Sequence, residues 1–124
     1  EIRVVDYKTG KKPQPRFSHD AKFQMRFYAL VYWRLFNEIP DQLRLMYLKV
    51  ADSLFLTPSS EELEYFERDL GELWAKITRD GETGQFRPKR SRLCDWCAFQ
   101  AYCPEFGGTP PQYPGWPGSA ADVE

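Results

Sequence analysis

The sequence predicts a mixed α/β fold, and three observations support this prediction. A strand-like apolar run opens the chain at residues 2–7, and a long helical pattern follows over residues 18–37. Two short strand patterns come next, at residues 43–50 and 53–56. An amphipathic pattern then starts near residue 59, so the expected order is β-α-β-β-α, followed by a tail rich in cysteine, proline and glycine.

The composition favours one small folded domain. Of the residues, 16% are aromatic and 28% are charged, a composition that can form a hydrophobic core. A chain of 124 residues is long enough for one such core and too short for two. The 17 Lys and Arg nearly balance the 18 Asp and Glu, so the net charge of −1 gives no bulk attraction to nucleic acid or membrane. No apolar run reaches the roughly 18 residues of a membrane span, so we expect no membrane partner.

The first helix is expected after a loop at residues 10–17. Its prolines favour a loop because proline removes an amide donor and restricts the preceding residue. Ser18 or His19 then opens a helix that runs to about Asn37. Apolar residues surround most of this helix, so we expect it to be largely buried.

The second half of the fold is predicted from a turn and a helix cap. Ala51 and Asp52 suit a tight hairpin between the two short strands. Ser59 can cap the next helix, and Glu62 completes a capping box. Gly81 is expected to end this helix.

Asp6 and Lys8 are the first residues that could carry chemistry. They lie two apart at the end of the first strand, so their side chains share a face. A carboxylate can bind a hard cation, and a neighbouring ammonium can stabilise charge that develops on a phosphoryl oxygen. The backbone carbonyl of Tyr7 is a further candidate ligand. The same residues can also be read as an ordinary surface ion pair.

Gln24 and Tyr28 form a second pair, spaced four residues apart on one face of the first helix. An amide and a phenol both suit contacts with phosphate or metal-bound water. The alternative is a surface glutamine next to a core tyrosine.

Cys94, Cys97 and Cys103 lie within ten residues. An odd number packed this tightly is a poor disulfide framework, and no secretion signal is visible, so we expect metal ligation in a reducing cytoplasm. Three thiolates need a fourth ligand from elsewhere. One alternative is a zinc site completed by His19 or by an external ligand.

Along the chain, the motifs follow one another in this order: the strand V-V-D-Y-K-T-G, the helix Q-M-R-F-Y-A-L, and Cys94-Asp95-Trp96-Cys97 with Cys103-Pro104. In this order the chain resembles the RecB-type branch of the PD-(D/E)XK nuclease superfamily. Its cysteine segment is similar to that of AddB-like and CRISPR-adaptation nucleases. The resemblance implies a restriction-endonuclease-like mixed sheet flanked by helices. It makes residues 1–106 the C-terminal part of a nuclease domain, with a cluster segment at 87–106 and an extended or disordered tail at 107–124.

The resemblance also assigns roles to the candidate residues. It makes Asp6 a ligand of Mg²⁺ or Mn²⁺ and Lys8 the catalytic lysine. Gln24 and Tyr28 would orient DNA phosphate or metal-bound water. Cys94, Cys97 and Cys103 would supply three of the four thiolates of a [4Fe–4S] cluster.

The implied function is a metal-dependent DNA exonuclease of repair or recombination. It would hydrolyse phosphodiester bonds in single strands or at duplex ends, with a helicase as a candidate partner. The resemblance also implies three features before these motifs: an acidic residue in a G-x-x-D-R run, a histidine on a helix, and a first cysteine. None of the three precedes the motifs in this sequence. We therefore expect a C-terminal fragment that is inactive without its missing N-terminal part. The alternative is a zinc-stapled module that binds nucleic acid or protein without catalysis.

Two groups of basic residues are the expected DNA contacts, since such contacts position a strand without reading its sequence. They are Lys11, Lys12 and Arg16 in the first loop, and Arg87, Lys89, Arg90 and Arg92 before the cysteines. Solvated loops are the alternative interpretation. The tail aromatics Tyr113 and Trp116 could stack on bases or dock on protein.

Overall fold

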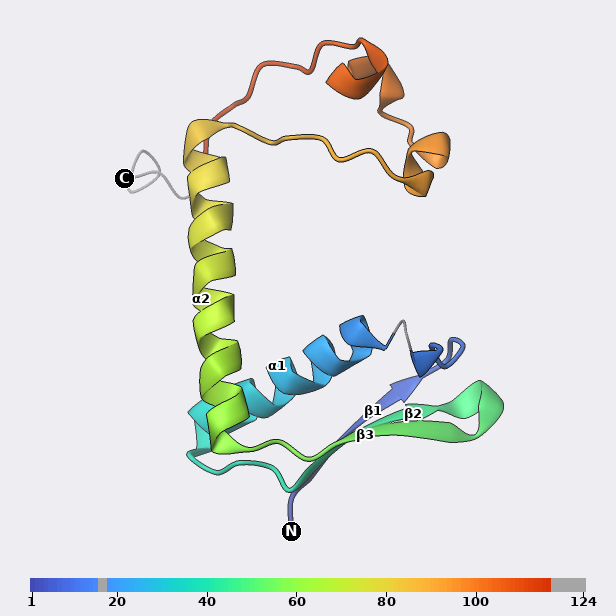
Figure 1. Cartoon of the computed structure of the whole chain (residues 1–124), viewed down its shortest axis with the longest axis vertical. Coiled ribbons are helices and arrows are strands. Elements are labelled where there is room, and N and C mark those ends of the chain that lie inside the picture. The colour runs from blue at the N-terminus through green and yellow to red at the C-terminus, as the bar shows by residue number, and fades with distance from the viewer. Residues whose placement is uncertain (16–17, 117–124) are drawn as a thin grey trace. The chain divides into compact units, whose positions relative to one another are not determined.

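The computed structural model of the protein describes residues 1–15 and 18–116 (Figure 1). Its strands and α-helices follow the order β1 (Arg3–Lys8), α1 (His19–Phe36), β2 (Gln42–Tyr47), β3 (Asp52–Leu56) and α2 (Ser60–Thr83). This order confirms the α/β fold class. Within the described ranges, no helix combines the length and the apolar character needed to cross a membrane.

The three strands form one mixed sheet in the order β1-β2-β3. β1 pairs in parallel with β2, in a register that sets Asp6 opposite Leu45 and Lys8 opposite Tyr47. β2 pairs with β3 in antiparallel orientation, so that Tyr47 lies opposite Asp52. Because β1 and β2 are parallel, their carboxyl ends meet at the same edge of the sheet.

Alternation along the strands decides which side chains meet α1. Leu43, Leu45 and Tyr47 of β2 are buried, while the residues between them are less so. On β1, Asp6 and Lys8 are half-buried and alternate with exposed neighbours. The period of two therefore brings a carboxylate and an ammonium to the helix-covered face of the sheet.

The core lies between this sheet face, one side of α1 and the first turns of α2. Phe23 and Phe66 pack edge to face there, with ring centroids 5.1 Å apart. Salt bridges join Arg26 to Glu62 and Arg34 to Glu67, which hold the two helices together. The buried hydrophobic cluster consists of Met25, Ala29, Leu30, Leu43, Leu45, Tyr47, Leu63 and Phe66.

The burial of α1 is less complete than the sequence predicts. Met25 and Leu30 are buried, but Phe27, Val31 and Leu35 remain exposed. The prediction of a largely buried helix is wrong for the described chain because the sheet and the start of α2 cover only part of its circumference.

The turn after β2 also differs from the prediction. β2 ends at Tyr47, and a short 3₁₀ helix (Leu48–Val50) replaces the rest of the expected strand. The hairpin closes at Ala51, which has a left-handed backbone with φ of 52°. The strand stops early because the chain must reverse direction within a few residues to pair β3 with β2.

α2 begins close to its expected cap and ends later than expected. The Ser59 hydroxyl accepts a hydrogen bond from the Glu62 amide at 3.2 Å, whereas the Glu62 carboxylate pairs with Arg26. Gly81 does not end α2, which continues to Thr83. Gly84 follows with φ of 68°, the left-handed conformation that terminates helices.

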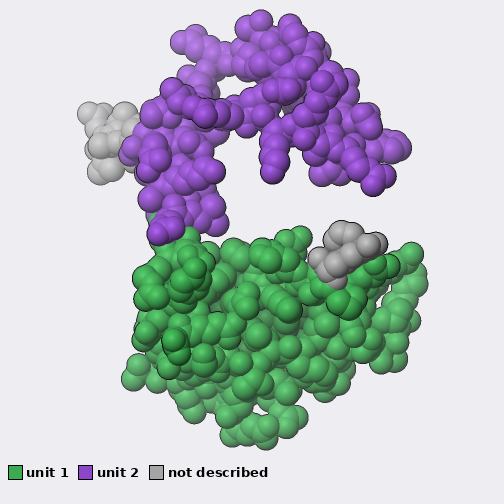
Figure 2. Space-filling model, viewed as in Figure 1, with its two compact units in different colours: residues 1–71 green, residues 72–124 purple. Residues whose placement is uncertain are grey.

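The chain divides into two compact units, Glu1–Gly71 and Glu72–Glu124 (Figure 2). All the hydrophobic residues that are buried among those described belong to the first unit. Up to residue 116, where its described part ends, the second unit contains the last part of α2 and three 3₁₀ helices, at Arg92–Trp96, Gln100–Tyr102 and Pro104–Phe106. The division of the chain into a nuclease part at residues 1–106 and a tail at residues 107–124 stays a prediction.

The described part of the tail, residues 107–116, forms no helix or strand, but it packs on α2. The Tyr113 hydroxyl donates a hydrogen bond to the Gly81 carbonyl at 2.7 Å. The ring of Trp116 lies where a side chain on Gly81 would point. Both tail aromatics therefore dock on their own chain.

Candidate functional site

The two predicted pairs come together in the first unit. The Lys8 ammonium lies 2.9 Å from Asp6 Oδ2, and the Tyr28 hydroxyl donates to the same oxygen at 3.4 Å. The Gln24 amide donates to the Tyr28 hydroxyl at 3.1 Å. β1 supplies the two charged groups and α1 supplies the two polar groups, so the spacings of two and four residues converge on one carboxylate oxygen. We call these four residues the Asp6 cluster.

The Asp6 cluster is half open to solvent. The side chains of Lys8 and Asp6 are 31% and 25% exposed, so a ligand can reach both. The hydrogen bond from Lys8 to Asp6 raises the pKa of the lysine above its ordinary value, and partial burial opposes this shift. Lys8 therefore remains a cation throughout the physiological pH range.

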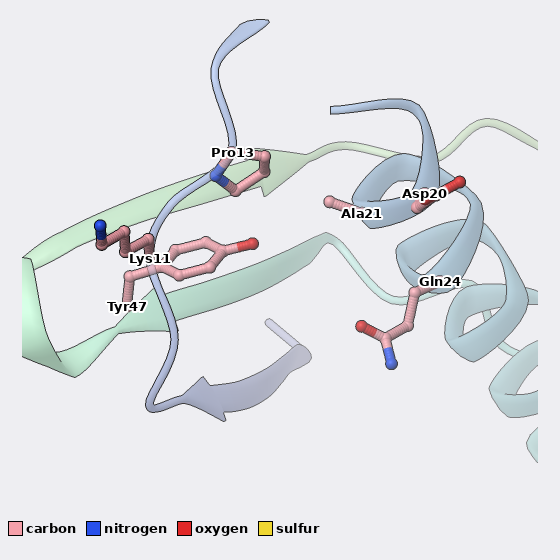
Figure 3. A pocket seen from close by; sticks show the side chains of 6 residues that line it. All are labelled: Lys11, Pro13, Asp20, Ala21, Gln24 and Tyr47. Carbon is pink, nitrogen blue, oxygen red and sulfur yellow. The ribbon is translucent and has the colours of Figure 1, made fainter. Parts of the chain in front are cut away.

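A pocket of about 430 Å³ lies beside the cluster. Lys11 and Pro13 of the loop after β1 form one wall, and the first turns of α1 form another with Asp20, Ala21 and Gln24 (Figure 3). Tyr47 lines the pocket from β2, with its hydroxyl directed toward α1. Gln24 belongs to both the pocket and the Asp6 cluster, so the two features adjoin.

An ion pair fixes the loop that forms this wall. The Lys12 ammonium lies 2.7 Å from a carboxylate oxygen of Asp52, at the start of β3. The other oxygen of Asp52 accepts a hydrogen bond from the Ser53 amide. These contacts, led by that of Lys12, lower the pKa of the Asp52 carboxyl below its ordinary value.

A comparison with known protein families assigns the chain to a superfamily. A family model described as the PD-(D/E)XK nuclease superfamily matches residues 1–104. The chain belongs to the PD-(D/E)XK nuclease superfamily. A search of curated proteins found no match to the chain. Membership in this superfamily implies nuclease chemistry on DNA, and its nucleases usually use Mg²⁺ or Mn²⁺.

The Asp6 cluster fits part of such a metal site. The Asp6 carboxylate and the Tyr7 carbonyl are oxygen donors of the kind that Mg²⁺ prefers. No group of three or more His, Cys, Asp or Glu side chains that could hold a metal occurs in residues 1–15 or 18–116. Within the described residues, the Asp6 cluster thus offers a single carboxylate that could hold such an ion.

The cysteines likewise do not form a finished metal site. Cys97 is exposed, while Cys94 and Cys103 are half-buried, and all three are free thiols. The Sγ atoms of Cys94 and Cys97 accept hydrogen bonds from the amides of Ser91 and Phe99. The three cysteines are not gathered into a metal-binding group in the part of the chain that the structure describes. His19 is exposed at the start of α1 and lies near Asp20.

The basic residues fall into different environments. Lys11 is exposed and lines the pocket, whereas Lys12 is engaged by Asp52. Arg16 lies outside the described residues. In the second unit, Arg90 stacks on the Phe106 ring at 4.8 Å, and Arg87, Lys89 and Arg92 are exposed.

The sequence pattern does not single out Tyr47 or Asp52 as site residues. It predicts Tyr47 only as one residue of a strand and Asp52 only as part of a turn. Parallel pairing of the first two strands, joined by a right-handed helical crossover, would have placed Tyr47 beside Lys8. Asp52 then follows from the register of the hairpin.

Proposed function

We propose that this chain is the C-terminal part of a metal-dependent DNA exonuclease of the RecB type that acts in repair or recombination. The single observation that carries the proposal is the convergence of Lys8, Tyr28 and, through it, Gln24 on the Asp6 carboxylate. A carboxylate with an adjacent ammonium on an open surface suits attack on a phosphodiester, whose transition state gains negative charge on oxygen.

Each residue of the cluster has a role in this proposal. Asp6, with the Tyr7 carbonyl, would hold Mg²⁺ or Mn²⁺, and the bound ion would supply Lewis-acid activation of water and phosphate. Lys8 places a positive charge beside the scissile phosphate, held in position by its contact with Asp6. Gln24 and Tyr28 orient the phosphate from α1.

The fragment itself is proposed to be inactive, because the described residues supply too few metal donors. The missing donors would come from an N-terminal part of the same protein. Arg87, Lys89, Arg90 and Arg92, together with Lys11 and Arg16, would track the phosphates of a single strand or a duplex end. The proposal includes a helicase partner that supplies the DNA strand. It also includes a cytoplasmic location.

The cysteine segment is proposed to hold a [4Fe–4S] cluster once an upstream cysteine supplies the fourth thiolate. What supports this is the tight spacing of Cys94, Cys97 and Cys103. Zinc held by the same thiolates is the alternative, and it would leave a stapled module that binds nucleic acid or protein.

The test is a nuclease assay on the longer protein with Mg²⁺ or Mn²⁺ and end-labelled single- and double-stranded DNA. We expect metal-dependent degradation that Lys8→Ala reduces by at least about a hundredfold, because removing a preorganised charge from the transition state typically costs that much. The 124-residue chain alone should leave the DNA intact.

A matched control is Lys22→Ala, which removes an exposed lysine of α1 that does not line the pocket. This variant should retain wild-type activity. Equal degradation by wild type and Lys8→Ala would overturn the nuclease proposal, and degradation by the isolated chain would overturn the proposed inactivity of the fragment.

A further inference from the structure

The pocket beside the Asp6 cluster has the size and lining of a small-ligand site. Its volume of about 430 Å³ falls within the range of roughly 300 to 1,000 Å³ that is typical of such sites. Pro13, Ala21 and the Tyr47 ring offer apolar surface, while the Tyr47 hydroxyl and the Gln24 amide offer hydrogen bonds. This mixture suits a nucleoside, which has a flat apolar face and polar edges.

The pocket's position selects which nucleoside it would receive. Gln24 lines the pocket and, through Tyr28, reaches the carboxylate that Lys8 contacts. A phosphodiester at Asp6 and Lys8 therefore has this pocket as its neighbour on the side of the first turns of α1.

The loop wall contains a residue that is not part of the pocket lining. Lys11 and Pro13 line the pocket, but Lys12, between them, turns to Asp52 on β3. Two loop residues thus line the pocket, and the residue between them is tied to the sheet through Asp52. We call the ion pair between Lys12 and Asp52 the loop latch.

We propose that the pocket is the subsite for the nucleoside that flanks the scissile phosphate, and that Lys12 is a positioning residue which holds the pocket wall through Asp52. The proposal rests on the nuclease function above and deepens it. It also changes the expected role of Lys12, which becomes an internal tether instead of a phosphate contact.

Asp20 is the one acidic residue of the pocket lining, and its side chain is fully exposed. Water and salt screen such a charge, so it opposes an incoming nucleotide only weakly. Asp20→Asn is therefore expected to tighten DNA binding slightly and to leave the loop in place.

Two substitutions break the latch while changing the charge in opposite directions. Lys12→Met removes a cation and Asp52→Asn removes an anion. If bulk electrostatics alone governed binding, Asp52→Asn would bind DNA more tightly than wild type. The latch predicts that both variants bind more weakly, by about two- to fivefold, as expected from an ion pair whose side chains are 30% and 53% exposed.

The experiment measures the affinity of the chain for a labelled single-stranded oligonucleotide by fluorescence anisotropy, and KM and kcat on the longer protein. We expect a raised KM with kcat nearly unchanged in both variants. The exchanged pair, Lys12→Asp with Asp52→Lys, should restore the wild-type KM. Unchanged melting temperatures would show that the variants fold.

Three results would overturn the proposal. They are tighter binding by Asp52→Asn, no rescue by the exchanged pair, or a wild-type KM in both single variants while Lys8→Ala still abolishes cleavage. The last result would leave the nuclease function standing and overturn only the present proposal. A wild-type protein that neither binds nor cleaves DNA would overturn both proposals together.

Discussion

Oδ2 of Asp6 is the point at which the candidate site is assembled, since it meets both the Lys8 ammonium and the Tyr28 hydroxyl. The contact with Asp6 stabilises the charged form of the Lys8 ammonium, which raises the pKa of Lys8 above its ordinary value of 10.5. Lys8 therefore connects the geometry of the candidate site to the pH dependence of folding.

The linkage predicts a loss of stability at alkaline pH. A group whose pKa is raised on folding stabilises the fold fully below its unfolded pKa, and this contribution disappears as the pH rises through the folded pKa. For Lys8 the loss should begin near pH 10.5. We expect wild type to be more stable than Lys8→Met at neutral pH and the difference to shrink above that value.

Urea unfolding of both proteins, followed by circular dichroism from neutral to alkaline pH, measures this difference. A stability difference that stays constant through the alkaline range would show that the contact between Lys8 and Asp6 contributes nothing to the fold.

At the scale of elements, α2 contains two glycines with different surroundings. A Cβ on Gly71 would meet nothing within 4 Å, whereas one on Gly81 would lie 2.0 Å from the Trp116 ring. Alanine in an open helical position stabilises a helix by up to about 1 kcal/mol relative to glycine. Gly71→Ala should therefore stabilise the protein, and Gly81→Ala should fail to do so because it displaces Trp116.

Thermal unfolding and tryptophan fluorescence test this pair. Gly81→Ala should shift the emission of Trp116 toward that of an exposed indole. In a Trp116→Ala background, the same Gly81→Ala change should recover the stabilisation seen at Gly71. Equal stabilisation by the two single glycine variants would contradict the packing of the tail on α2.

The contrast between these glycines shows what the sequence predicts and what it does not. Local signals gave the order of elements, the cap at Ser59 and the spacings within the Asp6 cluster, because each depends on residues a few positions apart. The surroundings of Gly81 depend on Trp116, more than thirty residues further along the chain, so a glycine that the local pattern predicts to end the helix lies within it and contacts the tail. The pocket escaped prediction for the same reason, since it requires the parallel register of β1 with β2.

At the scale of the whole molecule, stability is unevenly distributed. The hydrophobic residues that are buried in the described ranges all lie between Met25 and Phe66. Residues 86–113 rely on smaller contacts, such as the stacking of Arg90 on Phe106 and the edge-to-face packing of Phe86 on Tyr113. Few buried apolar groups and exposed backbone make a segment open easily.

Hydrogen exchange followed by mass spectrometry should therefore show slow exchange in β2 and α1 and fast exchange across residues 87–106 in the metal-free chain. Adding Zn²⁺, or iron with sulfide under anaerobic conditions, should slow exchange around Cys94 and Cys103 if the thiolates bind the metal, because ligation restricts the loops between them. Cys97→Ser should abolish that slowing and leave β2 unchanged.

The metal that produces the protection separates the two proposals for this segment. Protection by Zn²⁺ in the isolated chain would favour a stapled module, because zinc can complete a tetrahedral site with an external ligand. Protection by iron and sulfide only in the longer protein would favour a cluster completed by an upstream cysteine. Exchange around the cysteines that neither metal slows in either protein would contradict both, and the three thiols would then serve the fold without ligation.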